Sequence, residues 1–449
     1  MLRTDVVRIQ QQRPNYLADA LDDALLDVAP VESRGRVLEA LGTVVKATGV
    51  QARIGDLCEL RSQDSSWRMH ARVIGVQRHT TLLMPFGELE GIGVQTEVVH
   101  CGTAPSIRVG NSLLGRVVDG FGQPMDGMGP LKDTQEFPVH NRPPNALDRK
   151  RIQRSLQTGV RAIDAVLTCG EGQRMGVFAP AGAGKSTLLG MIAQGTAADV
   201  TVVGLIGERG REVREFIDIV LAPGRAANTV VVVATSDRPA GERVEAANVA
   251  TAIAEYFRQQ NRSVLLLIDS VTRYARALRE IGLAAGEPPT RRGYPPSVFS
   301  ALPTLVERAG QSANGAITAF YTVLVDDEEG DPIGEELRAL LDGHVVLSRE
   351  LAAADHYPAI DVAASRSRVM SHVTTKEHRK AAGELRELLA KHADIQVLLQ
   401  IGEYQAGADA LADKAIRCKP NITKLLRQQV GERMSLSETI ALLRRAAES

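Results

Sequence analysis

Short apolar runs alternate with amphipathic stretches through the middle of the chain. Five runs have the length and composition of buried strands: residues 175–180, 200–207, 229–235, 264–269 and 316–325. Helical stretches begin between these runs, near Lys185, Arg211, Glu242 and Thr272. Strands and helices that alternate at this spacing predict βαβ units and a mostly parallel sheet covered by helices on both faces.

Two regions of different character flank this α/β block. From Gly35 to Val109, short apolar runs are broken by glycines and polar turns, which predicts a small all-β domain. After Met370 the sequence is charged, and an apolar stripe that includes Leu385 and Leu388 runs beside lysine and glutamate. This second pattern predicts a C-terminal helical domain.

An N-terminal segment and a proline-rich connector complete the organisation. Apolar residues between 17 and 28 recur at nearly helical spacing opposite an acidic face. They predict one amphipathic helix that packs against protein rather than against anionic lipid. The connector spans residues 138–144. The predicted segments are an N-terminal helical segment at 1–34, an all-β domain at 35–109, an α/β domain at 110–369 and a helical domain at 370–449.

The charge balance and the cysteine pattern limit the possible classes of function. The 53 basic and 54 acidic residues nearly cancel, so we expect no nucleic acid as the main partner. The 4 cysteines form no CxxC pair, so we expect neither a zinc ribbon nor a disulfide framework. The N-terminus lacks the apolar core of a signal peptide, and apolar runs such as 264–268 are too short to cross a bilayer. These features predict a cytoplasmic protein that is at most peripheral to a membrane.

Residues 178–187 read FAPAGAGKST and lead from an apolar strand directly into an apolar helix. This is the context of a P-loop, in which backbone N–H groups of a glycine-rich loop surround phosphate oxygens. Lys185 would reach the β and γ phosphates, and the Ser186 hydroxyl would ligate Mg²⁺. Ala179 replaces the first glycine of the pattern, at a position with no obligatory phosphate contact. The predicted nucleotide-binding residues of this loop are Ala181, Gly182, Ala183, Gly184, Lys185, Ser186 and Thr187.

Two carboxylates follow predicted strands of the same block. The run VLLLID ends at Asp269, and a carboxylate after an apolar strand is the Walker B pattern, which holds Mg²⁺ beside the P-loop. Glu208 stands at the carboxyl end of another predicted strand, the edge at which doubly wound sheets bind ligands. From these features alone, Glu208 is either a general base that activates water or a surface ion-pair partner of Arg209 or Arg211.

Three longer runs are more specific: LLGRVVDGFGQPMDG at 113–127, GLIGERGRE at 204–212 and YPAID at 357–361. They resemble the rotary ATPase superfamily, the catalytic subunits of F-type ATP synthases and their secretion relatives. The resemblance implies an α/β fold with a RecA-like P-loop core and a parallel sheet, preceded by a small N-terminal β-barrel and followed by a C-terminal helical domain. It also implies that Glu208 is the catalytic base, that Arg209 acts beside it, and that Tyr357 stacks on adenine.

The segment DVAASRSRV at 361–369 resembles the stretch that carries the arginine finger in the non-catalytic subunit of ATP synthase. Position matching puts the finger at Arg368, and Arg366 is the alternative. A guanidinium from a neighbouring subunit would stabilise the transferring phosphoryl group, by a factor on the order of 10³ to 10⁵ in rate. Because one chain carries both Glu208 and Arg368, we expect a closed homohexamer with equivalent sites.

Within the superfamily, GLIGERGREVREF at 204–216 and VDDEEGDPI at 325–333 resemble the type III secretion ATPases more than the ATP synthase β subunits. The Ala-Pro-Ala before Gly182 resembles injectisome ATPases more than the flagellar export ATPase. The resemblance implies a Mg²⁺-dependent ATPase, peripheral at the inner face of the inner membrane, that couples ATP hydrolysis to chaperone release, cargo unfolding and export. The implied partners are a central coiled-coil stalk protein, a peripheral regulator or stator protein, the export gate and chaperone–cargo complexes.

Other functions remain possible at this point. A flagellar export ATPase is the alternative within the same class. A Rho-type RNA-stimulated hexameric ATPase would need a barrel with aromatic residues among basic ones, and this chain is 4% aromatic with Trp67 as its single tryptophan. A scaffold subunit should have lost Lys185 or Glu208, and both are present. The turn at 402–413 lies where the family contacts its stalk, and its composition is equally typical of a solvated loop between helices.

Overall fold

The computed structural model describes residues 34–64, 66–222, 224, 226–325 and 330–448. The amphipathic helix expected between residues 17 and 28 lies outside the described residues. The described chain forms two compact units. The first contains a β-barrel, and the second contains the α/β sheet together with the C-terminal helices.

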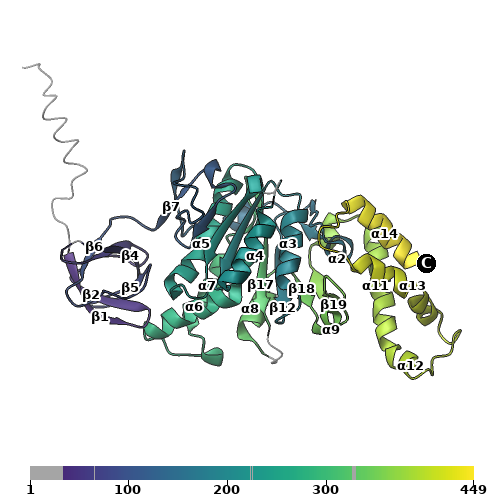
Figure 1. The fold of residues 1–449 in the computed structure, drawn as a ribbon. Coiled ribbons are helices and arrows are strands. Elements are labelled where there is room, and N and C mark those ends of the chain that lie inside the picture. Colours follow the sequence, from purple (N-terminus) through teal and green to yellow (C-terminus); the bar gives the residue numbers. More distant parts are fainter. Residues whose placement is uncertain (1–33, 65, 223, 225, 326–329, 449) are drawn as a thin grey trace, which may run out of the picture. The chain divides into compact units, whose positions relative to one another are not determined.

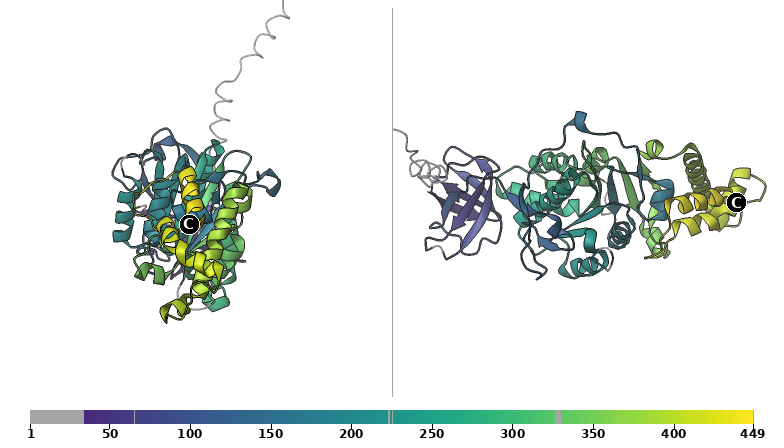
Figure 2. Two further views of the ribbon diagram at one scale, coloured as in Figure 1. Left: turned by 90° about the vertical axis from the view of Figure 1, so that its right-hand side faces the viewer. Right: turned by 90° about the horizontal axis from the view of Figure 1, so that it is seen from above.

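The first unit is a closed β-barrel, drawn in purple in Figures 1 and 2. Its strands, in the order β1-β2-β5-β4-β3-β6, are β1 (Arg34–Leu41), β2 (Val44–Thr48), β5 (Thr81–Pro85), β4 (Arg68–Val76), β3 (Leu57–Arg61) and β6 (Glu97–His100). Successive residues of a strand face opposite sides, so Val37, Cys58 and Leu60 are buried while their chain neighbours are more exposed. The expected small N-terminal β-barrel is confirmed.

The barrel ends earlier than the all-β segment that the sequence suggested. Its last strand ends at His100, whereas that segment extends to Val109. Residues Ser106–Val109 form β7, which pairs antiparallel with β9 (Gln135–Pro138) in the second unit. Ile107 and Val109 are buried in that unit, so their apolar side chains contribute to its core rather than to the barrel.

The second unit is built on one mostly parallel sheet. Its strand order is β19 (Ile360–Ser367), β18 (Gly343–Leu347), β12 (Arg174–Ala179), β17 (Ala316–Leu324), β15 (Ser263–Asp269), β13 (Val200–Ile206), β14 (Thr229–Ala234) and β8 (Val117–Asp119), and β16 (Gly310–Gln311) pairs with β17. Every pair from β18 to β8 is parallel, whereas β19 runs antiparallel to β18. The inner strands are buried along nearly their whole length because both faces are covered, which explains their continuous apolar runs.

Helices connect the strands as the alternation predicted. They are α2 (Arg161–Val166), α3 (Lys185–Gly195), α4 (Gly210–Val220), α5 (Ala240–Gln259), α6 (Val271–Ala284), α7 (Pro296–Val306), α8 (Pro332–Leu340) and α9 (Arg349–Ala353). Short elements lie between them: η1 (Asn111–Leu113), η2 (Ala146–Asp148), β10 (Ser155–Leu156), β11 (Cys169–Gly170), η3 (Ala226–Asn228) and η4 (Arg291–Gly293). The five predicted strands and four predicted helix starts are confirmed to within two residues, whereas β8, β18 and β19 were missed.

The charged sequence after Met370 is helical, as expected. It forms α10 (Met370–Val373), α11 (Lys376–Asp394), α12 (Gln396–Gln400), α13 (Ala410–Leu426) and α14 (Leu436–Glu448). Helices α11, α13 and α14 pack on one another (Figure 1), and Leu385, Leu388, Leu425 and Leu443 are buried among them. These helices share a compact unit with the sheet, which the sequence did not indicate. No helix of the described residues is both long and apolar enough to span a bilayer.

Candidate active site

The glycine-rich loop lies where the buried strand β12 ends and α3 begins. Gly182 and Gly184 adopt φ values of 79° and 82°, a left-handed conformation that strongly favours glycine. Ala179 is the last residue of β12 and pairs with Leu324 of β17. A residue in regular strand conformation does not need glycine, which explains why this chain tolerates alanine at the first position of the motif.

Lys185 brings the two predicted carboxylates together. Its Nζ lies 2.8 Å from Glu208 Oε1 and 2.5 Å from Asp269 Oδ1. Glu208 follows β13 and Asp269 ends β15, and these neighbouring parallel strands present their carboxyl ends at one edge of the sheet. Glu208 is 5% exposed and Asp269 is 2% exposed. Glu208 therefore points into the site and is not a surface partner of Arg209 or Arg211.

Two further residues complete this cluster, and sequence reasoning missed both. Arg273 of α6 donates from Nη2 to Glu208 Oε2 at 3.2 Å, and Thr322 of β17 donates to Asp269 Oδ1 at 2.8 Å. Gly207, at a φ of 68°, leaves the space that Arg273 occupies, because a Cβ there would lie 2.9 Å from Arg273 Cδ. Gly207 was therefore the feature of the sequence that could have indicated a side chain, here Arg273, packed against the turn before Glu208.

The cluster is electrostatically balanced and largely withdrawn from water. Burial alone would lower the pKa of the Lys185 ammonium, but Asp269 and Glu208 outweigh that effect and raise it. Burial raises the pKa of the Asp269 carboxyl, although the Lys185 ammonium opposes the rise. Lysine therefore stays charged at neutral pH, and it holds both carboxylates in the arrangement that the structure describes.

The residues present fit a magnesium ion bound together with nucleotide phosphates. Ser186 stands in the first turn of α3 with its side chain exposed, and Asp269 presents a buried carboxylate at the adjacent strand end. Hydroxyl and carboxylate oxygens are hard ligands of the kind that Mg²⁺ prefers, and the ion usually keeps several waters. Three or more His, Cys, Asp or Glu side chains do not gather into a metal cage anywhere in the described residues. A phosphate-assisted magnesium site is thus the type that suits this cluster.

Tyr357 lies beside the P-loop. A Cβ placed on Gly184 would be 3.2 Å from Tyr357 Cε1 and 3.3 Å from Cδ1, so the ring packs directly on this glycine. The Tyr357 side chain is 38% exposed, which leaves part of the ring accessible. Its backbone carbonyl accepts a hydrogen bond from Gln428 N at 2.9 Å. The position is compatible with stacking on a base next to the phosphate loop.

Arg209 does not join the Lys185 cluster in this structure. It precedes the first residue of α4, and its side chain is 78% exposed. Its nearest acidic partner is Glu212, with Nη1 3.8 Å from Oε1. An arginine in this position can contact a ligand or a second chain. Within one protomer, the ion-pair partners of Glu208 among the described residues are Lys185 and Arg273, and Arg209 is not one of them.

Arg368 lies near the amino ends of the parallel strands β12 and β18, whereas the P-loop follows the carboxyl end of β12. Gly343 at the start of β18 pairs with Met175 at the start of β12 and also with Ser367 at the end of antiparallel β19. The P-loop follows the other end of β12, which has 6 residues. At about 3.3 Å per residue, that strand separates the two edges by about 20 Å. The structure therefore does not bring Arg368 to the Lys185 cluster of its own chain.

Two cavities lie near these residues. One of about 490 Å³ opens at the end of β12 beside Pro180 and Asp331, and Lys185, Glu208 and Asp269 do not line it. The other, about 520 Å³, contains the exposed Arg368 and is bordered by a group of cationic side chains. Its arginines are Arg366, Arg368, Arg379 and Arg386. The candidate active site is therefore defined by the geometry of the P-loop and its acids rather than by cavity size.

A P-loop follows a buried parallel strand, and its lysine contacts acids at the ends of β13 and β15. This arrangement defines a RecA-like nucleoside triphosphatase. The nucleotide-binding domain of the ATP synthase alpha/beta family matches residues 159–367, and the β-barrel domain of that family matches residues 37–102. The C-terminal domain of the type III secretion ATPase EscN matches residues 374–445.

Relatives that match nearly the whole chain identify the family within this class of nucleoside triphosphatases. The chain is 52% identical over 428 residues to a type 3 secretion system ATPase of Xanthomonas euvesicatoria, covering 95% of this chain and 97% of the relative. It is 47% identical over 411 residues to a flagellum-specific ATP synthase of Bacillus subtilis, covering 91% and 94%. The chain belongs to the type III secretion system ATPase family.

Solved structures agree with this assignment. The assembled ATPase EscN of enteropathogenic Escherichia coli matches with a TM-score of 0.87 at 47% identity, over 92% of this chain and all of that chain. EscN in complex with its central stalk EscO matches with a TM-score of 0.85 at 47% identity over the same 92%. The expected order of barrel, nucleotide-binding core and helical domain is therefore confirmed.

Proposed function

We propose that this chain is the ATP-hydrolysing motor of a bacterial type III protein-secretion system. The observation that carries the proposal is the contact of Lys185 with both Glu208 and Asp269 at the P-loop of a member of this family. ATP hydrolysis would be coupled to chaperone release, cargo unfolding and export. The protein would act in the cytoplasm, peripheral at the inner face of the inner membrane.

Each residue of the cluster has a distinct proposed role. The P-loop backbone, with Lys185, binds the β and γ phosphates, and the exposed Thr187 lies in the same first turn of α3. Glu208 accepts a proton from the attacking water, and Arg273 orients its carboxylate. Ser186 and Asp269 would hold Mg²⁺, which neutralises charge on the β and γ phosphates when it is bound. Lys185 leaves Asp269 as the phosphates enter.

The nucleotide-binding role extends to the rest of the loop and to Tyr357. Ala181, Gly182, Ala183 and Gly184 present the backbone between β12 and α3. The ring that packs on Gly184 would stack on adenine, because its accessible face lies beside the phosphate loop. Arg209, which is exposed next to Glu208, would contact the nucleotide or a neighbouring chain.

We further propose that Arg368 serves the site of a second copy. It lies one strand length away from its own P-loop, at the other edge of the sheet, so a guanidinium in that place cannot reach its own phosphates. A head-to-tail interface that repeats closes into a ring in which every chain both binds ATP and supplies a finger. The assembled state of EscN supports this arrangement, and we expect a homohexamer here.

The proposed partners follow from the family and from one surface feature. EscN binds a central stalk, and the matching contact in this chain would be the turn between α12 and α13. Asp413 stiffens this turn by accepting from Tyr404 Oη at 2.9 Å and from Gly407 N at 2.8 Å. Next to it, Val397 and Ile401 are 65% and 61% exposed, which suits an apolar coiled-coil surface. A peripheral regulator or stator, the export gate and chaperone–cargo complexes are the other partners that we propose.

A flagellar export ATPase is the second candidate within the family. The 47% identity to the flagellum-specific relative favours it less than the 52% identity to the Xanthomonas protein. The Ala-Pro-Ala at 179–181 also favours an injectisome. Complementation separates the two candidates, because the gene should restore secretion in an injectisome ATPase deletion strain and not motility in a flagellar one.

A size-resolved ATPase assay of the wild type and Arg368→Ala tests the proposed function. Hydrolysis should appear only in the ring fraction and should require Mg²⁺. The variant should bind nucleotide normally while its turnover falls about 10³-fold, because the finger acts on the transition state. A fully active monomer, or a variant with wild-type turnover, would contradict a site shared between copies.

A further inference from the structure

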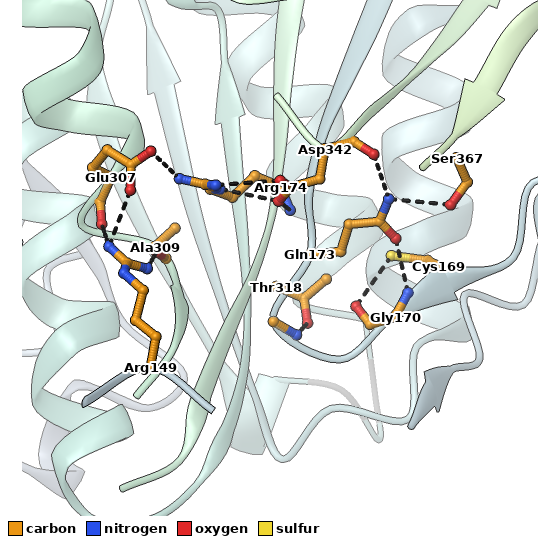
Figure 3. A network of polar contacts seen from close by, with 11 residues as sticks. Arg149, Cys169, Gly170, Gln173, Arg174, Glu307, Ala309, Thr318, Asp342 and Ser367 are labelled. Atoms are coloured by element: carbon orange, nitrogen blue, oxygen red, sulfur yellow. Dashed lines mark hydrogen bonds and ion pairs between the residues drawn. The ribbon is translucent and has the colours of Figure 1, made fainter. Parts of the chain in front are cut away.

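Polar contacts join the starts of β12 and β18 at the sheet edge that carries Arg368 (Figure 3). The Asp342 carboxylate accepts from Arg174 Nε at 3.0 Å and from Arg174 Nη2 at 3.2 Å. The backbone N–H of Arg174 donates to the same carboxylate at 3.1 Å. Glu307 forms an ion pair with Arg174 Nη1 at 2.5 Å, and Arg149 contacts Glu307 at 3.1 Å. A forked, charge-assisted pair of this kind fixes the turn at Asp342 to the strand that leads to the P-loop.

Gln173 occupies the centre of the same network. It is 0% exposed, and both ends of its amide have partners. Its Oε1 accepts from Gly170 N at 2.9 Å, while its Nε2 donates to the Asp342 carbonyl and to Ser367 Oγ, both at 3.1 Å. A buried amide with both ends paired holds its partners firmly, because the loss of either contact leaves a polar atom unsatisfied.

Ser367 is the residue immediately before Arg368, at the end of β19. Its hydroxyl accepts from Gln173 and donates to the Thr168 carbonyl at 3.0 Å. The backbone N–H of Arg368 donates to the Asp342 carbonyl at 2.9 Å, the same oxygen that accepts from Gln173. Two hydrogen bonds therefore hold the Ser367 hydroxyl, and a third holds the backbone N–H of Arg368 itself.

The Arg368 side chain itself is held far less tightly. It is exposed, and its Nη2 donates to the Arg338 carbonyl at 3.2 Å in the last turn of α8. That carbonyl is among the last four of the helix, which lack helical partners and attract a cation. The main chain at this position is thus fixed, while the guanidinium is free to turn toward a second copy.

We infer that Gln173 and Ser367 are positioning residues for Arg368, and that they set the point from which its guanidinium reaches the neighbouring site. The inference rests on the proposed role of Arg368 as the finger. A long side chain that acts across a boundary depends on its anchor, because a displacement of about 1 Å in a catalytic group can cost about 10²-fold in rate. Both residues lie at the strand ends opposite the P-loop of their own chain, so their effect should appear in turnover and not in binding.

Ser367→Ala and Ser367→Thr form the central comparison. The alanine variant loses the hydroxyl contacts to Gln173 and Thr168, and its kcat should fall about tenfold while KM and nucleotide affinity stay the same. The threonine variant keeps the hydroxyl and should recover most of the turnover. Ser437→Ala, an exposed serine in α14, is the matched control and should keep wild-type turnover.

A double-mutant cycle with Arg368→Ala distinguishes positioning from a general loss of structure. If Ser367 acts through Arg368, adding Ser367→Ala to the Arg368→Ala chain should cause no further loss of activity. Gln173→Met should give the same pattern, and gel filtration with thermal unfolding of each variant monitors ring formation and folding. If Ser367→Ala fails to fold, the same measurements on Gln173→Met test the inference.

Three results would overturn the inference. The first is wild-type kcat in Ser367→Ala and in Gln173→Met. The second is an equal loss of activity with and without Arg368, which would indicate a purely structural role. The third is full turnover in Arg368→Ala, which would remove the finger itself and the proposed shared site with it. The first two outcomes leave the proposed function intact, so the two failures are distinguishable.

Discussion

Replacing Glu208 by glutamine tests the proposed general base with little change in shape. The carboxylate is 5% exposed, and it contacts Lys185 at 2.8 Å and Arg273 at 3.2 Å. Glutamine fills the same space but does not accept a proton from water. General-base catalysis contributes about 10² to 10⁴ in rate, so we expect kcat to fall by that factor, equivalent to about 3 to 5 kcal/mol of barrier.

Nucleotide binding should survive this substitution. The P-loop backbone, Lys185 and Ser186 are unchanged, and the amide oxygen of glutamine still accepts from the Lys185 ammonium. Because the lost interaction exists only in the transition state, kcat and kcat/KM should fall equally. The assay is phosphate release by the ring fraction, together with equilibrium binding of a fluorescent ATP analogue.

A matched substitution on the surface provides the control. Glu215 lies on α4, and its ion pair with Arg211 at 3.2 Å is exposed on both sides. Glu215→Gln should keep wild-type kcat, because exposed pairs contribute about 0 to 1 kcal/mol. The reasoning is refuted if Glu208→Gln keeps most of the wild-type turnover, or if its nucleotide affinity falls as far as its kcat.

Two predictions concern stability. Arg308→Met should lower the free energy of unfolding by about 3 to 5 kcal/mol, because it removes the cation that pairs with the Glu255 carboxylate at 2.7 Å. Both side chains are nearly unexposed, so the carboxylate would stay buried without this partner. An unchanged denaturation midpoint would contradict this prediction. The Arg116 guanidinium holds the pKa of Asp126 below its usual range. This stabilisation is present above a pH of about 4 and is lost as the pH falls through the lower folded-state pKa. Asp126→Asn should therefore reduce stability at pH 7 and flatten its decline below about pH 4 in thermal unfolding, and a wild-type acid slope would count against the pairing.

Much of the nucleotide-binding core was predictable because its signals are local. The loop at 178–187 places phosphate-binding backbone, a lysine and a hydroxyl within ten consecutive residues, and the flanking strand and helix have clear periodicity. The strands that sequence reasoning missed lack that clarity. Strand β18 alternates buried and half-buried residues over a short length, and β19 mixes apolar residues with serine and arginine. Strand β19 lies at the margin of the sheet and pairs with β18 on one side, so its apolar pattern is weaker than that of an inner strand.

The same distinction separates the members of the site. Asp269 could be predicted because an apolar strand ends at it, whereas Thr322 is one polar residue within a buried strand and gave no signal. The sequence likewise gave no sign that Arg273 belongs to the site, since an arginine in an amphipathic helix is ordinarily solvated. Both side chains gain a role only from the strand or helix that packs beside the carboxylate.

By itself the sequence determined the class of chemistry, because the P-loop, the Walker B strand and the alternation of strands and helices are properties of short segments. Only the tertiary structure decided which groups meet. Lys185 reaches carboxylates that are 23 and 84 residues away in the chain, and the parallel order of β12, β17, β15 and β13 sets those contacts. Because β19 runs antiparallel to β18, its last residue lies beside the start of β18, and Arg368 follows there, at the end of the strands opposite the P-loop. Strand order and direction result from the packing of the whole unit, and a local pattern does not contain them.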